Sequence, residues 1–137
     1  MGVTDSERSK QEVDYRVVPM HPYRSTLFIW LGDTLDDVAS SGLYLESSED
    51  VYDPDDKSIK NSGACTVPDP NRSHILFKRG GTSCEVVSHE VFHVISHTLF
   101  TYRSTPLNED TEEVWAYLMG KTMQLTVDAL RSMGEEI

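Results

Sequence analysis

The chain has 137 residues and a formal net charge of −11 at pH 7, which fits one modest globular domain. Its 12 Lys and Arg residues are scattered, so the clustered basic surface that nucleic acid requires is not expected. No apolar run approaches the roughly 20 residues of a membrane span, and the polar start lacks the apolar core of a secretory signal. We expect a disordered polar segment at 1–12 and a single domain at 13–137, cytoplasmic and without nucleic-acid or membrane partners.

The first half of the chain predicts two strands and a helix. Residues 13–20 and 25–31 are rich in β-branched and aromatic side chains, which favours strands. Thr34 and Asp37 then stand three positions apart, as in a capping box, and predict a helix over 34–45.

The middle of the chain predicts a loop and a hairpin. Residues 46–56 are acidic and poor in apolar side chains, which is typical of a solvated loop. Strand-like segments at 63–67 and 73–78 flank the turn-forming sequence PDPN, and the two glycines at 80–81 follow them. We expect these two strands to form an edge hairpin.

The second half predicts two helices. Thr82 and Glu85 form a second capping-box pair, and apolar residues then recur at helical spacing to about residue 100. A longer pattern runs over 111–133 and stops at Gly134, a residue favoured just past a helix end. The predicted fold class is α+β, with a small mixed or antiparallel sheet of about four strands packed against both helices.

The sequence HEVFH within the first of these helices indicates a metal site. His89 and His93 are four positions apart, so on a helix both imidazoles project from one face and can share one Zn²⁺. Glu90, the next residue after His89, then lies about 100° from it around the helix axis. Two alternatives stay open: ordinary histidines on an amphipathic helix, and a Cys84 nucleophile acting with His89, which needs more assumptions than a zinc helix.

An HExxH helix followed by a glutamate at the start of the next helix resembles the gluzincin metallopeptidases. The resemblance covers residues 63–133 and is greatest to minimal, single-domain minigluzincins and to small metallopeptidase-like proteins of phages and prophages. In that family a glutamate three residues before an alanine binds the metal, which matches Glu113 and Ala116. By this resemblance the three zinc ligands and the general base are, in order, His89, His93, Glu113 and Glu90.

The resemblance implies a zincin-like domain that hydrolyses a peptide or amide bond. A zinc-activated water would attack the carbonyl, with Glu90 as general base. The strand at 73–78, just before the motif helix, would be the edge strand that pairs with an extended peptide or protein substrate. The alternative function is a metallopeptidase-like protein with a structural, assembly or interaction role, for example in a phage, and no turnover.

Helix geometry gives a separate ranking of the third ligand. We expect the small residues Ala116 and Gly120 to face the HEVFH helix closely. On an ideal helix, Glu113 lies about 40° from that direction and Glu112 about 60° on its other side. Glu109 precedes the helix, so the order is Glu113, Glu112, Glu109.

Other polar residues near the motif are expected to have supporting roles. His97 continues the stripe of histidines, but it lies about 12 Å along the axis from His89, too far to share one Zn²⁺. We expect it to be structural or to contact the ligands. Tyr102 and Tyr117 are candidates for stabilising an oxyanion, although packing roles are favoured for both.

Overall fold

The computed structural model describes residues 13–40 and 63–137. The described strands form one mixed sheet in the order β1-β2-β4-β3, in which β2 and β4 are parallel and each outer strand is antiparallel to its neighbour. The strands are β1 (Asp14–Pro19), β2 (Thr26–Gly32), β3 (Ala64–Val67) and β4 (Arg72–Lys78). The predicted strands and the α+β class are therefore confirmed.

The position of β4 corrects one prediction. The strand at 73–78 was expected at the edge of the sheet, but β4 lies between β2 and β3. Its residues 73–77 are all buried, as is typical of a strand covered on both faces. The edge strand of the hairpin is β3, which pairs only with β4 among the described strands.

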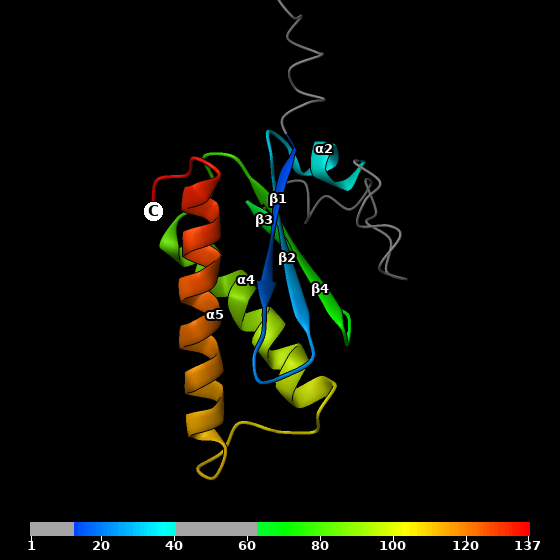
Figure 1. The fold of residues 1–137 in the computed structure, drawn as a ribbon, viewed down its shortest axis with the longest axis vertical. Coiled ribbons are helices and arrows are strands. Elements are labelled where there is room, and N and C mark those ends of the chain that lie inside the picture. The colour runs from blue at the N-terminus through cyan, green and yellow to red at the C-terminus, as the bar shows by residue number, and fades with distance from the viewer. Residues whose placement is uncertain (1–12, 41–62) are drawn as a thin grey trace, which may run out of the picture.

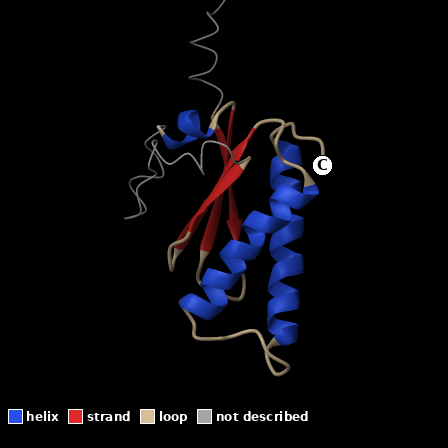
Figure 2. Cartoon of the chain, turned by 180° about the vertical axis from the view of Figure 1, so that it is seen from behind, coloured by secondary structure: helices blue, strands red, loops and turns tan. Residues whose placement is uncertain are grey.

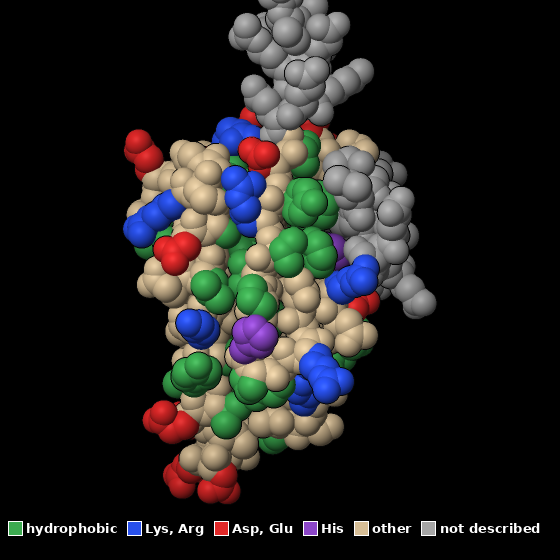
Figure 3. Space-filling model, viewed as in Figure 1, with side chains coloured by type: hydrophobic (Ala, Val, Ile, Leu, Met, Phe, Trp, Pro, Cys, Tyr) green, Lys and Arg blue, Asp and Glu red, His purple; other side chains and the backbone are tan. Residues whose placement is uncertain are grey.

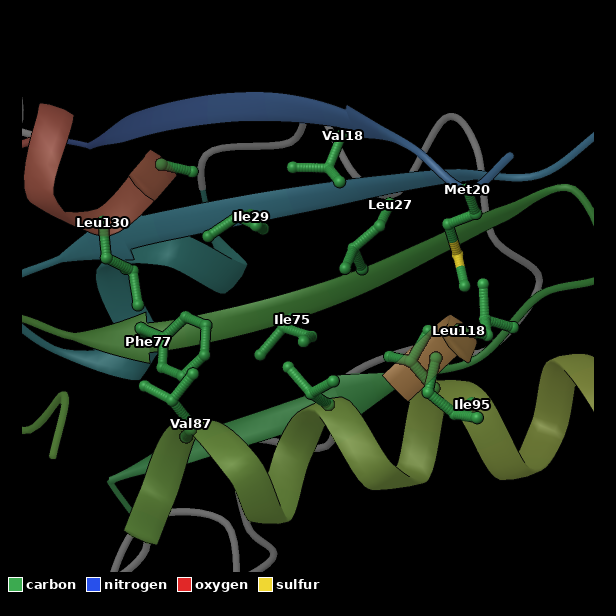
Figure 4. Close-up of a cluster of buried hydrophobic side chains, with 14 of the residues drawn as sticks. Val18, Met20, Leu27, Ile29, Ile75, Phe77, Val87, Ile95, Leu118 and Leu130 are labelled. Atoms are coloured by element: carbon green, nitrogen blue, oxygen red, sulfur yellow. The ribbon is translucent and has the colours of Figure 1, made fainter. Parts of the chain in front are cut away.

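Two long helices cover one face of this sheet. Helices α4 (Cys84–Ser96) and α5 (Glu112–Ser132) lie side by side there, whereas the short α2 (Leu35–Ala39) packs near one end of the other face (Figures 1 and 2). Figure 4 shows apolar side chains of the strands pointing toward those of both helices. The labelled residues of β2, β4, α4 and α5 in this core are Leu27, Ile29, Ile75, Phe77, Val87, Ile95, Leu118 and Leu130. Burial of this apolar surface fixes α4 against the sheet.

The N-terminal cap of α4 differs from the predicted one. Ser83, not Thr82, is the cap residue, and its hydroxyl accepts from the backbone N–H of Val86 at 3.2 Å. Thr82 is buried and its hydroxyl donates to Glu135 at 2.7 Å. The adjacent hydroxyl therefore takes the cap position.

The helix predicted over 111–133 agrees with α5, whereas the helix predicted over 34–45 is shorter in the structure, because α2 ends at Ala39 with Ser40 as its C-cap. Thr34 caps α2 by accepting from the backbone N–H of Asp37 at 3.0 Å. Helix α5 is followed by Gly134, whose φ of 99° suits glycine. The disordered segment predicted at 1–12, residues 41–45 of the predicted helix and the loop predicted at 46–56 lie outside the described residues.

The face of the sheet away from α4 holds a buried histidine. His74 is 1% exposed, and its Nδ1 accepts from the indole N–H of Trp30 at 3.0 Å. Burial lowers the pKa of His74 to about 4, since desolvation disfavours the imidazolium; Asp69 raises the pKa and Arg72 lowers it. His74 is therefore neutral in the folded protein at pH 7.

This shift in pKa predicts a loss of stability in mild acid. Between pH 6.5 and pH 4 the unfolded chain protonates residue 74 and the folded chain does not, so the free energy of unfolding falls as pH falls, by roughly 3 kcal/mol in all. Above pH 6.5 His74 is neutral in both the folded and the unfolded chain, so it adds no pH dependence to the free energy of unfolding. Urea unfolding across this range should show the slope in the wild type and a smaller one in His74→Asn, which keeps an acceptor without titrating. Equal slopes would contradict the prediction.

Candidate functional site

The candidate site lies on α4, which has one buried and one exposed side. The buried residues of this helix are Val87, Glu90, Val91, Val94 and Ile95. His89 and His93 are exposed. Because positions four apart lie one above the other on a helix, both imidazoles project from the same side of α4.

The Nε2 atoms of the two imidazoles lie close together. Their Nε2 atoms are 3.1 Å apart, and the rings meet nearly edge to face at 78°. Two nitrogen ligands at tetrahedral corners about 2.05 Å from a zinc ion would be about 3.3 Å apart. A neutral imidazole donating to its neighbour gives a similar distance. The 3.1 Å separation is therefore compatible both with two ligand positions of one zinc ion and with a hydrogen bond between the two rings.

Glu90 has a different environment from its histidine neighbours. Its side chain is 8% exposed. The hydroxyl of Thr66, on β3, donates to its Oε2 at 2.5 Å. The structure thus places a carboxylate one position from His89, between α4 and the edge of the sheet.

The segment that leads into α5 is well held and acidic. The side-chain oxygen of Asn108 accepts from the backbone N–H groups of Asp110 and Thr111 at 2.9 and 3.1 Å. Figure 3 shows acidic side chains at the lower end of the molecule, where α5 begins; those exposed there are Glu109, Asp110, Glu112 and Glu113. Negative charge at a helix N-terminus is favourable with or without a metal.

The predicted third ligand is not gathered with the histidines. Within residues 13–40 and 63–137, no three side chains of His, Cys, Asp or Glu form a group that could hold a metal ion. The structure therefore brings His89 and His93 together, and it leaves Glu113, Glu112 and Glu109 outside their group.

The expected contact face of α5 is wrong. Ala116 and Gly120 are exposed, and a Cβ added to Gly120 would meet no atom within 4 Å. Larger side chains make the contact instead: Trp115 is buried, with its ring centroid 6.2 Å from that of Phe92 on α4. The angular ranking of the glutamates measured from the small pair therefore has no structural basis, and the choice of Glu113 rests on the family resemblance.

His97 begins an irregular end to the motif helix. Residues His97–Thr101 form one turn of π-helix, where a regular helix was predicted to about residue 100, and the backbone N–H of Tyr102 donates to the carbonyl of His97 at 2.9 Å. His97 is half-buried, and its Nδ1 has no hydrogen-bond partner among the described residues. That His97 is not a ligand stays a prediction.

Thr66 is the site residue that the sequence did not reveal. It belongs to the predicted strand at 63–67, where a threonine is ordinary. No local motif links it to Glu90, which follows 24 positions later. Only the strand order, which puts β3 at the edge beside α4, would have identified it.

Comparison with known proteins adds no family to these observations. Searches against protein-family models, curated proteins and solved structures find no match to this chain. Among the helices of residues 13–40 and 63–137, none combines the length and apolar character needed to cross a bilayer. The function of the chain is therefore inferred from the geometry of α4 and its neighbours.

Proposed function

We propose that the chain is a zinc-dependent metallopeptidase of the gluzincin type, with zincin-like packing of its sheet against α4, that hydrolyses a peptide or amide bond. The observation that supports this most is the 3.1 Å separation of the Nε2 atoms of the exposed residues His89 and His93. Glu90 next to them is buried against β3. Paired imidazoles and an adjacent, separately held carboxylate are what hydrolysis by an HExxH helix requires.

The proposed roles follow from the chemistry of each side chain. His89, His93 and Glu113 would hold one Zn²⁺, which when bound acts as a Lewis acid on a carbonyl and lowers the pKa of water. Glu90 would accept a proton from the attacking water and donate it to the leaving amine nitrogen. The two imidazoles bind as neutral ligands.

Metal content and cleavage together test this proposal. The purified full chain should bind one equivalent of zinc and cleave members of a fluorogenic peptide library, and a chelator should abolish the cleavage. A folded protein that takes up no zinc when zinc is supplied would contradict the proposal.

The third ligand is tested separately with three matched variants. In structural zinc sites a binding free energy of about 10–16 kcal/mol is divided among four protein ligands, so one ligand contributes about 3 kcal/mol. Glu113→Gln should therefore weaken zinc binding about 10²-fold. Glu112→Gln and Glu109→Gln should change it little. All three side chains are exposed, so folding should be unaffected. Competition with a chromophoric chelator measures the affinity, and a larger loss in Glu112→Gln would transfer the role to that residue.

The absence of a gathered third ligand among the described residues favours one alternative. A chain with the HExxH helix and no complete metal site would have a structural, assembly or interaction role without turnover. The effect of Glu90→Gln, discussed below, separates the two functions.

A further inference from the structure

Thr66 occupies the edge of the sheet on the side that faces α4. In the β3–β4 ladder it pairs with Ile75, and directly paired residues project from the same face of a sheet. Ile75 is fully buried in the core that includes α4 residues. The threonine side chain therefore points toward α4 from the outermost described strand.

The hydroxyl of Thr66 has one proton and two acceptors in Glu90. It lies 2.5 Å from the carboxylate Oε2 and 3.3 Å from the backbone carbonyl oxygen. Hydrogen bonds from a hydroxyl to an ionised carboxylate are typically 2.5–2.7 Å long and are stronger than neutral ones. The proton is therefore donated to Oε2.

This hydrogen bond restricts the flexible side chain of Glu90. A glutamate has three rotatable torsions, whereas the β-branched threonine is restricted at χ1 and is held in a strand. Among the described residues no other group donates to the carboxylate of Glu90, which is 8% exposed. Oε1 is therefore the carboxylate oxygen to which no described residue donates.

We infer that Thr66 is a positioning residue for Glu90: it holds Oε2 against the edge strand and leaves Oε1 as the atom that accepts the proton from water. The inference rests on the proposed function, in which Glu90 is the general base. Because Thr66 lies on β3, the orientation of the base depends on the position of this strand.

Two substitutions separate the hydroxyl from the shape of the side chain. Thr66→Val removes the donor at nearly constant volume and suits a strand, and Thr66→Ser keeps the donor. With a fluorogenic peptide substrate, Thr66→Val should lower kcat about 10- to 100-fold with KM nearly unchanged, the loss expected for a hydrogen bond to a charged group. Thr66→Ser should recover most of kcat, and zinc content should be equal in all three proteins.

Crystal structures of the three proteins give a readout that is independent of turnover. The Glu90 carboxylate should leave its wild-type orientation in Thr66→Val and keep it in Thr66→Ser. An unchanged orientation in Thr66→Val, or an unchanged kcat, would overturn the inference. A wild type that cleaves no peptide would instead contradict the proposed function, and the carboxylate orientation would still decide the role of Thr66. If Thr66→Val does not fold, Thr66→Ala is tested by the same readouts.

Discussion

Glu90→Gln is expected to abolish peptide hydrolysis while zinc stays bound. The amide cannot accept a proton from water, and loss of a general base typically costs about 10²- to 10⁴-fold in rate. Gln keeps the volume of the side chain and an oxygen that can accept from Thr66, so the contact at the edge of the sheet should persist. The measurement is kcat/KM on a fluorogenic peptide, with zinc content determined on the same sample.

Glu85→Gln is the matched control for this substitution. Glu85 lies in the first turn of the same helix and is exposed, so its loss changes the net charge equally without touching the site. It should leave kcat/KM unchanged. If Glu90→Gln is as active as the wild type in a biological assay, the structural or assembly function is supported and the peptidase is rejected.

The secondary structure was predictable where its signals are local. The strands over 14–19 and 26–32 follow from their β-branched and aromatic content. The start of α2 follows from Thr34, whose side chain caps the helix. The cap of α4 was misplaced by one residue because Thr82 and Ser83 are both suitable caps. The choice between them is made by Glu135, 53 positions after Thr82, and no local pattern contains that information.

Strand order was beyond a local reading for the same reason. The parallel pairing of β2 with β4 joins residues that are far apart in the sequence, such as Leu27 and Ser73. Hydrophobic periodicity does not specify which strands become neighbours. The hairpin of β3 and β4 was predicted, but which of its strands lies at the edge depends on where β2 pairs. The strand at 73–78 was consequently predicted at the edge of the sheet, whereas it lies between β2 and β3.

In the site, too, contacts within one helix were predictable and contacts between helices were not. The meeting of His89 and His93 depends only on a four-residue spacing within one helix, so the sequence predicted it. A helical wheel gives directions relative to one another but not the side that faces a neighbour. For α5 the large residue Trp115 sets that side, not the small pair Ala116 and Gly120.

His93→Ala is expected to remove zinc from an otherwise intact protein. Two ligands would remain of the proposed three, and a ligand contributes about 3 kcal/mol, so the affinity should fall about 10²-fold or more. His93 is exposed and Ala is a better helix former. Without metal, the free energy of unfolding of the variant should therefore lie within about 0.5 kcal/mol of that of the wild type. Metal analysis after dialysis and urea unfolding with and without zinc measure both quantities.

The control for His93→Ala is His97→Ala on the same stripe. His97 is half-buried and is not grouped with the histidine pair, so its variant should keep one equivalent of zinc. Zinc that binds only the folded state stabilises it, by about 2.7 kcal/mol at 100 times the dissociation constant. That stabilisation should appear in the wild type and in His97→Ala and should vanish in His93→Ala. Equal zinc stabilisation in all three would show that the metal binds elsewhere, and the HEVFH helix would then lose its proposed role.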